Sequence, residues 1–378
     1  MRLLCCCLMV VCAAIGLISD SNTRTSAQET KAEGAQGLSI FDVSVSTASF
    51  NPSRGERVEL RYHLSRSALV TIKVFDPDLH ITRVLTEKTQ KDAGVQGEVW
   101  DGKDIDGKLV PNEAYFFTIE AEDALGSQAV YDPITFSGGE PFDLGQAQFD
   151  RESGTLTYKL SQPSRVLIRI GIPGSALLKT LVDWEPRIGG EITEYWNGKD
   201  EDNVIDLWRQ GNFTTMITYF TLPETSVITF GNTTYTYREY KANGSSARPK
   251  KVERPILNPR KLSPHFLTSR VNNRSFKVLL SFPEIEEKPA QTVPMIKDQV
   301  LVRVDIHEKD REVLLQQQFE IILFVDTVYF AEEERGYVPF NFPWELKQLP
   351  EGEHILTVNI VTFNDQFGVG SRKVKVVK

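Results

Sequence analysis

The chain has 378 residues, four cysteines and a formal net charge of −8 at pH 7. This length gives room for about two or three domains of ordinary size, each able to bury its own core. A mildly acidic chain is poorly suited to whole-surface nucleic-acid binding, whose affinity depends on basic patches, so we expect no nucleic-acid partner.

Residues 1–27 are predicted to be a secretory signal peptide. An apolar run from Leu3 to Ile18 follows a charged start, is too short for a comfortable membrane span, and is followed by small residues before Gln28. All the cysteines lie in this run: Cys5, Cys6, Cys7 and Cys12. Cleavage would therefore leave no thiol for disulfides, metal sites or catalysis. The alternative is a lipid on Cys12, which would tether the protein to a membrane, although the preceding Val11 is bulkier than that modification favours.

After a flexible polar arm at residues 28–37, a first domain is predicted over residues 38–137. Apolar and polar residues alternate in Val58–Leu64, Val70–Phe75 and Tyr115–Ala121, which is the period of a strand with one buried face. Ile81–Leu85 reads as a further short strand. Short strands separated by turn signals at intervals of about eight to twelve residues are typical of an all-β sandwich.

A repeat organises the first half of the chain. Trp100–Pro111 (WDGKDIDGKLVP) is echoed 96 residues later by Trp196–Asp206 (WNGKDEDNVID). Two further pairs keep this offset: Tyr62–Ser65 with Tyr158–Ser161, and Gly94 with Gly190. A register kept over a whole domain length indicates a duplicated module.

The first copy resembles the immunoglobulin-like domain of flagellar hook-cap (FlgD-type) proteins over about residues 48–121. The likeness rests on the order and spacing of its motifs, which include Phe50-Asn51-Pro52, Tyr62-His63-Leu64, Ala93-Gly94, Trp100-Asp101-Gly102-Lys103-Asp104 and Val110-Pro111. It departs at Asn112-Glu113-Ala114, where the family usually has a small residue and a glycine before the aromatic. The hook-cap family's N-terminal secretion and assembly region is not recognisable, so the resemblance implies the fold and not a flagellar function.

The second copy, placed in a domain over residues 138–242, is degenerate. It keeps Trp196 and Gly198, but Asn203 replaces the turn glycine and Leu207-Trp208-Arg209 replaces the Val-Pro approach. Val227–Tyr240 is rich in Thr and Tyr and is predicted to be the last strand of this module or an extension of it.

Residues 243–265 are predicted to form a basic, Pro-rich linker, and residues 266–378 a third immunoglobulin-like sandwich. Val300–Ile306 alternates as a strand, and Phe319–Phe330 suits a buried strand pair or one bent strand. The segment from Leu349 to Val377 resembles the final hairpin of many bacterial immunoglobulin-like domains. The predicted fold class is therefore all-β, with tandem immunoglobulin-like β-sandwich domains.

Two short motifs imitate ligand-binding loops. Gly97–Asp104 has the glycines of a phosphate loop, but Asp104 stands where a hydroxyl belongs and no helix pattern follows, which favours a hairpin turn. Asp101, Asp104 and Asp106 with Gly107 resemble part of a calcium loop, yet the first ligand position and the distal acid are missing. Turn formation explains these residues more simply, and whether calcium binds is left open.

The tryptophans are the candidate ligand-binding aromatics. Trp100 and Trp196 could stack on sugar rings, but their repeated position in a strand pattern favours buried anchors. Trp208 has no counterpart in the first copy and stands in a polar setting, so it is the candidate for an exposed, ligand-binding aromatic. For Trp344, too, a buried core position must be weighed against an exposed, ligand-binding one.

No catalytic pattern is recognisable. The five histidines have no metal-ligand spacing, and neither a zinc-protease helix motif nor a nucleophile elbow occurs. Acidic pairs such as those in Glu284–Glu287 and Glu332–Glu334 are typical of solvated loops. We therefore expect no cofactor, no metal and no enzyme activity.

The expected protein is secreted or periplasmic, with association with the outer membrane as a further alternative. Its expected role is structural or adhesive, through binding of a protein or glycan of the bacterial cell envelope. An alternative from another class is a carbohydrate-binding accessory protein or weak hydrolase that uses surface carboxylates near Trp208. The basic linker is expected to be a solvated spacer, or else a weak, salt-sensitive attachment to an acidic polymer.

Overall fold

A computed structural model describes residues 37–143, 147–243, 261–285 and 293–378. The chain divides into two parts, Met1–Gly37 and Leu38–Lys378, and the second contains the strands and helices. The predicted signal peptide, the arm up to residue 36 and linker residues 244–260 lie outside the described residues. Within the described residues, no helix is long and apolar enough to cross a membrane.

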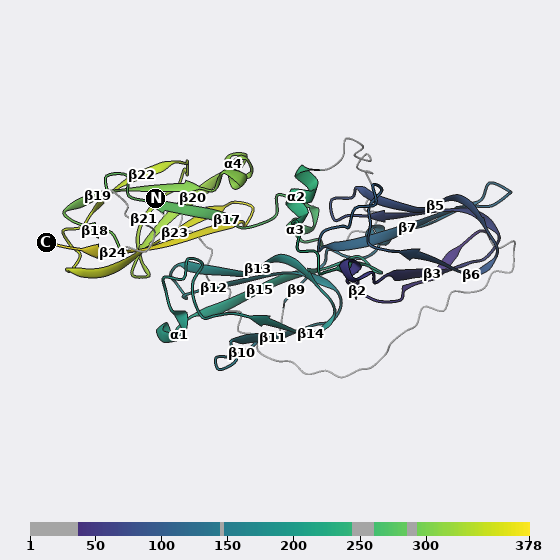
Figure 1. Ribbon diagram of the computed structural model, residues 1–378, viewed down its shortest axis with the longest axis horizontal. Coiled ribbons are helices and arrows are strands. Elements are labelled where there is room, and N and C mark those ends of the chain that lie inside the picture. The colour runs from purple at the N-terminus through teal and green to yellow at the C-terminus, as the bar shows by residue number, and fades with distance from the viewer. Residues whose placement is uncertain (1–36, 144–146, 244–260, 286–292) are drawn as a thin grey trace. The chain divides into compact units, whose positions relative to one another are not determined.

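The prediction of an all-β chain of tandem immunoglobulin-like sandwiches is confirmed. Strands fill several sheets, and the helices between them are short (Figure 1). Buried apolar side chains form separate clusters within successive groups of strands, around Val70 in the first, Ile168 in the second and Val302 in the third. We call these groups the first, second and third sandwich.

The first sandwich has two sheets, ordered β1-β3-β6 and β2-β16-β7-β4-β5, with β8 beside β7. Its elements are β1 (Ile40–Val45), β2 (Ser49–Phe50), η1 (Pro52–Arg54), β3 (Val58–Leu64), β4 (Ala68–Phe75), β5 (Ile81–Lys91), β6 (Gly94–Trp100), β7 (Ala114–Glu122), β8 (Gln128–Tyr131), η2 (Pro133–Thr135) and β16 (Val227–Thr229). The predicted alternation is confirmed in β3, where every second side chain is buried. Strand β5 is longer than the predicted Ile81–Leu85, because its pairing with β4 continues through register shifts to Lys91.

The second sandwich repeats this plan with sheets ordered β10-β11-β14 and β13-β12-β15-β9. Its elements are β9 (Pro141–Asp143), β10 (Gln148–Asp150), β11 (Thr155–Leu160), β12 (Ser164–Gly171), β13 (Leu177–Arg187), β14 (Gly190–Tyr195), α1 (Leu207–Gln210) and β15 (Thr214–Thr221). The repeat extends to individual strand pairs. Leu64 lies opposite Gly94 in the first sandwich, and Leu160 lies opposite Gly190 in the second, at the same offset.

Both glycines of that pair have left-handed backbone angles, with φ of 106° at Gly94 and 110° at Gly190. An L side chain is strained in this conformation, which explains why glycine recurs at the start of each strand. At the later turn, Gly107 (φ 76°) is replaced by Asn203 (φ 60°). Asparagine tolerates this region better than most residues, so the fold of the turn survives the substitution.

Residues 227–242 do not extend the second sandwich as expected. Strand β16 pairs parallel to β2 and antiparallel to β7, so it completes a sheet of the first sandwich. The following helix α2 (Tyr237–Ala242) begins with a capping box formed by Thr236 and Glu239. The prediction was wrong because Val227–Thr229 is an apolar strand sequence whose local pattern does not encode which sheet supplies its partners.

The third sandwich follows α3 (Pro264–Leu267). Its elements are β17 (Phe276–Ser281), β18 (Met295–Ile296), β19 (Gln299–Ile306), α4 (Glu308–Leu315), β20 (Phe319–Val325), β21 (Val328–Glu333), β22 (Phe340–Glu345), β23 (Gly352–Thr362) and β24 (Phe367–Val376). Strand β17 pairs first with β24 and then with β19, so it joins two layers. The predicted strand at Val300–Ile306 and the final hairpin are confirmed, and Phe319–Phe330 forms a strand pair rather than one bent strand.

Candidate functional site

Trp100 and Trp196 are the buried anchors that the repeat predicts. Trp100 is 1% exposed and Trp196 is 5% exposed. Each indole N–H donates a hydrogen bond to the backbone carbonyl three residues later in the chain, at 2.9 Å to Lys103 and 2.8 Å to Lys199. The same hydrogen bond at the same offset shows that the two modules use one local structure. These rings are therefore part of the core, and they are too deeply buried to stack on a sugar.

Trp208 is half-buried and not the exposed aromatic that was expected. Its ring lies edge-on to Trp196 at 6.2 Å and packs against an apolar cluster that also includes Phe324 of the third sandwich. A Cβ added to Gly198 would lie 2.2 Å from this ring. In the first sandwich the equivalent Gly102 is covered by Pro52, so Trp208 fills the place that η1 fills there. Ligand binding by Trp208 stays a prediction.

Replacing Gly198 with alanine is expected to lower the free energy of unfolding by about 1–3 kcal/mol more than the backbone cost alone. The new methyl group would collide with Trp208 and would also sit on a backbone with φ of 77°. The matched control is Gly174→Ala, where φ is 72° but nothing lies within 4 Å, so only the backbone cost of about 1–2 kcal/mol remains. Urea unfolding of both variants measures the difference, and equal losses would mean that Trp208 does not press on Gly198.

The aspartates that imitate a calcium loop are turn formers. One oxygen of Asp104 accepts from the backbone N–H groups of Asp106 (3.0 Å) and Lys108 (2.8 Å), and the other accepts from the Tyr240 hydroxyl at 2.7 Å. Asp200 repeats the capping role in the second module. Within the described residues, no three His, Cys, Asp or Glu side chains gather in a way that could hold a metal ion.

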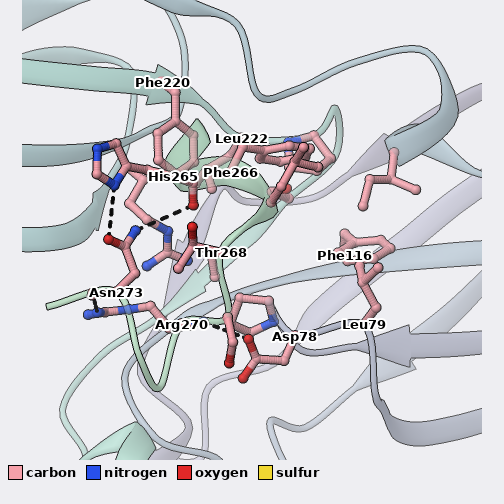
Figure 2. Close-up of a pocket in the computed structure, with 18 of the residues that line it drawn as sticks. Asp78, Leu79, Phe116, Phe220, Leu222, His265, Phe266, Thr268, Arg270 and Asn273 are labelled. Atoms are coloured by element: carbon pink, nitrogen blue, oxygen red, sulfur yellow. Dashed lines mark hydrogen bonds between the residues drawn. The ribbon is translucent and has the colours of Figure 1, made fainter. Parts of the chain in front are cut away.

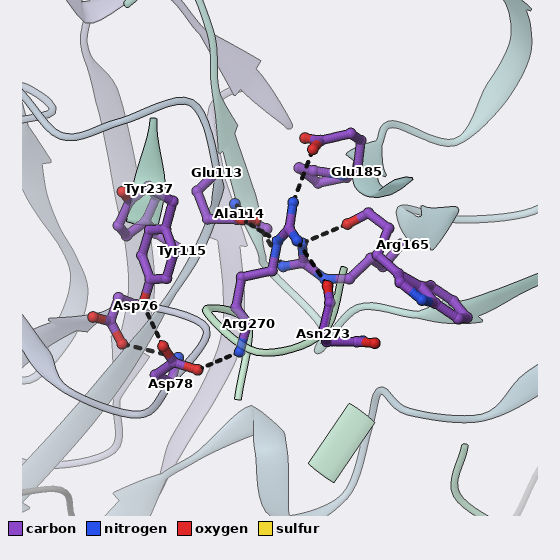
Figure 3. Close-up of polar contacts among 12 residues, drawn as sticks. Asp76, Asp78, Glu113, Ala114, Tyr115, Arg165, Glu185, Tyr237, Arg270 and Asn273 are labelled. Atoms are coloured by element: carbon purple, nitrogen blue, oxygen red, sulfur yellow. Dashed lines mark hydrogen bonds and ion pairs between the residues drawn. The ribbon is translucent and has the colours of Figure 1, made fainter. Parts of the chain in front are cut away.

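The most unusual polar group is Glu113, which lies where the first and second sandwiches meet (Figure 3). Its side chain is 0% exposed, and the residue stands two positions after the end of the Trp100–Pro111 repeat. One carboxylate oxygen accepts from Arg165 of the second sandwich at 2.7 Å and from the Ala114 N–H at 2.8 Å. The other accepts from the Nε of Arg270 at 2.8 Å. One carboxylate thus holds two cations from different segments.

Arg165 and Arg270 have further partners around this carboxylate. Arg165 donates to the carbonyl of Trp184 at 2.9 Å, and Arg270 donates to Glu185 at 2.8 Å and to the carbonyl of Asn273 at 3.2 Å. We call Glu113, Arg165, Arg270 and Glu185 the junction cluster. It joins the first sandwich, the second sandwich and the segment that leads into the third.

Burial alone would raise the pKa of Glu113 above its ordinary value of 4.5. The adjacent guanidinium groups of Arg165 and Arg270 outweigh this effect and hold the pKa below that value. The carboxylate reciprocally raises the pKa of Arg270, against the effect of burial. Glu113 and Arg270 are therefore both charged near neutral pH.

Helix α2 attaches to the first sandwich through two aspartates of the turn after β4. Lys241 donates to Asp76 at 2.7 Å, and the Tyr237 hydroxyl donates to Asp78 at 3.0 Å. The backbone N–H of Arg270 donates to the second oxygen of Asp78 at 2.6 Å. The turn at Asp76-Pro77-Asp78 is closed by the bond from the Leu79 N–H to the Asp76 carbonyl, and it also serves as an attachment point.

A pocket of about 480 Å³ opens beside this junction (Figure 2). Its apolar wall combines Phe116 of the first sandwich, Phe220 and Leu222 of the second, and Phe266 of α3. Phe266 packs against the apolar clusters on both sides. A pocket of this size is within the range that binds small molecules, and such sites are common between domains.

The second and third sandwiches are joined by different chemistry. The side-chain amide of Asn359, 3% exposed, accepts from the Leu177 N–H and donates to the Leu177 carbonyl, both at 2.8 Å. It therefore satisfies the edge of β13 as a neighbouring strand would. Arg169 adds a bond of 2.6 Å to the carbonyl of Asp365 and lies over the Phe367 ring at 4.1 Å.

Sequence reasoning did not assign Glu113, Arg165, Arg270 or Asp78 to a site. A signal for Glu113 was present, because Asn112-Glu113-Ala114 is where the chain departs from the hook-cap pattern. A charged residue directly before a buried strand requires a partner, and the departure marked the place. Arg165 carried no comparable signal, since alternation in β12 does not distinguish a buried arginine from an exposed one.

The fold and the junction together define a protein of tandem, repeated immunoglobulin-like β-sandwiches. A stretch of 85 residues is 38% identical to the basal-body rod modification protein FlgD of Salmonella typhimurium, and equally to that of Salmonella typhi. It covers 20% of this chain and 36% of each relative, so the chain spans about a third of the length of the curated relatives it matches. No known family model matches the sequence.

Solved structures give distant likenesses. A tetra-tandem repeat from the extending region of a large adhesion protein is 12% identical, with a TM-score of 0.18 and coverage of 90% of this chain and 74% of that one. A bacterial ice-binding adhesin is 10% identical, with a TM-score of 0.19 and coverage of 91% and 99%. The endo-beta-1,4-mannanase of Thermotoga petrophila is 21% identical, with a TM-score of 0.22 and coverage of 30% and 22%. Scores this low carry no argument about function.

Proposed function

We propose that the chain is a non-catalytic structural or adhesion-type protein of the bacterial cell envelope, secreted or periplasmic. It binds a protein or glycan of the envelope through loops or an exposed sheet face, and the sandwiches serve to present those surfaces. The first two sandwiches are FlgD-type immunoglobulin-like modules in this proposal. The match of one 85-residue stretch to FlgD supports the module type, and a flagellar role does not follow from a match to about a third of that protein.

The observation that carries the proposal is the junction cluster. Both oxygens of Glu113 are occupied by Arg165, Arg270 and a backbone N–H, and the carboxylate is 0% exposed. A general acid or base must reach a substrate proton within hydrogen-bond distance, directly or through one water. Glu113 cannot act as a general acid or base in this way, because neither of its oxygens can be reached by a substrate. The chain uses a fully buried carboxylate and two largely buried arginines to join modules, which is what a structural protein requires.

The test is co-sedimentation of the purified protein with envelope fractions of the source organism, either untreated, protease-treated or digested with polysaccharide-degrading enzymes. We expect saturable binding that one of the two treatments removes, and no release of reducing sugar ends during incubation. Release of sugar ends above that of a heat-denatured sample would support the carbohydrate-active alternative. Absence of saturable binding to every fraction would contradict an envelope role.

A further inference from the structure

The junction pocket is apolar on one side and carries a carboxylate on the other. The phenyl rings of Phe116, Phe220 and Phe266 line it from three separate segments of chain (Figure 2). Asp78 lines the same pocket from the turn after β4 and is 8% exposed. The space is about 480 Å³, which exceeds what a few waters need and suits a small organic molecule.

The carboxylate of Asp78 accepts hydrogen bonds but has no positively charged partner among the described residues. Its oxygens accept from the Arg270 N–H at 2.6 Å and the Tyr237 hydroxyl at 3.0 Å (Figure 3). Within the described parts of the chain, no lysine, arginine or histidine nitrogen forms an ion pair with it. A mostly buried carboxylate without a counter-ion is costly, because desolvation of its charge is only partly offset by neutral donors.

The cations nearest to this pocket are already committed to other acids. Arg165 and Arg270 also line the pocket, but Arg165 pairs with Glu113, and Arg270 pairs with Glu113 and Glu185. Lys241 is bound to Asp76 at 2.7 Å and lies 3.0 Å from the Nδ1 of His80. The charge left without a partner in the pocket is therefore the negative charge of Asp78.

We propose that this pocket binds a small ammonium compound with an apolar body, which goes beyond the structural role proposed above. The body lies against the rings of Phe116, Phe220 and Phe266, and the ammonium group donates to the carboxylate of Asp78. The aromatic wall adds to the selection, since phenyl faces attract cations. A carboxylate-bearing ligand would be repelled at the same position.

The experiment is a methyl NMR titration of the full chain, labelled so that the methyl groups of Leu79, Ile134 and Leu222, which line the pocket, are observed. The probes are 2-phenylethylammonium, the neutral 2-phenylethanol and the anionic phenylacetate. We expect saturable shifts at these methyl groups with the ammonium probe, and binding at least roughly tenfold weaker for the alcohol, because only the ammonium probe brings a positive charge to its hydrogen bond with the carboxylate.

Two variants, Asp78→Asn and Thr268→Trp, test whether the probes bind in this pocket. Asp78→Asn is expected to reduce the affinity for the ammonium probe to that for the alcohol. Asp123→Asn is the matched control, because Asp123 caps a turn of the same sandwich through the Leu125 and Ser127 N–H groups and does not line the pocket. Thr268→Trp, at an exposed position on the rim, is expected to abolish binding of both probes while leaving the buried contacts in place.

Equal affinity for the ammonium and alcohol probes would overturn the proposal, as would shifts that do not saturate or that map away from these methyl groups. If Asp78→Asn fails to fold, the ratio of the two probe affinities in the unmodified protein and the loss of binding in Thr268→Trp still decide the outcome. An unchanged ammonium affinity in a folded Asp78→Asn variant would also overturn it.

Discussion

Replacement of Glu113 with glutamine is expected to lower the free energy of unfolding by about 3–5 kcal/mol. The change removes the negative charge but leaves Arg165 and Arg270 in place, with side chains only 5% and 11% exposed. Breaking a buried ion pair from one side is costly, because the remaining charge stays buried without its partner. Equilibrium urea unfolding, followed by tryptophan fluorescence, measures the loss.

The matched control is Glu120→Gln. Glu120 pairs with Lys73 at 2.7 Å, but its side chain is 46% exposed, so its loss should cost at most about 1 kcal/mol. A second replacement, Arg165→Met in the Glu113→Gln background, should recover part of the stability because it removes one uncompensated cation. Equal costs for Glu113→Gln and Glu120→Gln would contradict the view that the junction cluster is a buried network.

The stability difference between the unmodified protein and Glu113→Gln is also expected to depend on pH. Because the folded pKa of Glu113 lies below its ordinary 4.5, its contribution is complete above about pH 4.5 and is lost as the pH falls through the folded pKa. The stability difference between the unmodified protein and Glu113→Gln should therefore be constant near neutral pH and shrink in acid. Urea midpoints at a series of pH values measure this difference. A difference that grows on acidification has the wrong sign for this account.

Truncation of either anchor tryptophan is the second prediction with a large effect. Trp100→Ala and Trp196→Ala are each expected to cost about 3–5 kcal/mol, because a large buried ring is replaced by a cavity. Each variant also loses the indole hydrogen bond to Lys103 or Lys199. Thermal or urea unfolding of the two variants measures the cost.

The control stands next to the second anchor in the chain. Tyr195 is 78% exposed, and Tyr195→Ala should change stability by no more than about 0.5 kcal/mol. If Trp196→Ala were as mild as Tyr195→Ala, the second module would not share the core structure of the first. A comparable loss for both tryptophans supports the repeat as a structural unit.

Strands, turns and the repeat were predictable because their information is local. Two-residue alternation located β3 and β19, and the constant offset located the paired anchors Trp100 and Trp196. Those features follow from which face of a strand is buried. They require no knowledge of how one module meets the next.

The features that were missed all depend on contacts between distant segments. Strand β16 joins the first sandwich because β2 and β7 offer it partners, more than 100 residues away. The polar setting of Trp208 in the sequence gave no sign that Gly198 would leave room for its ring. Arg165 and Arg270, the partners of Glu113, could likewise not be predicted. A single sequence does not indicate which charged residues meet in the fold.

The junction cluster is expected to hold the first and second sandwiches together in one arrangement. Pulsed electron spin resonance tests it, with spin labels at Val99→Cys and Tyr195→Cys, which are 51% and 78% exposed, after Cys5, Cys6, Cys7 and Cys12 are replaced by serine. We predict one narrow distance distribution, which broadens in Glu113→Gln under conditions where the variant is still folded. A broad distribution in the protein with Glu113 intact would contradict the claim.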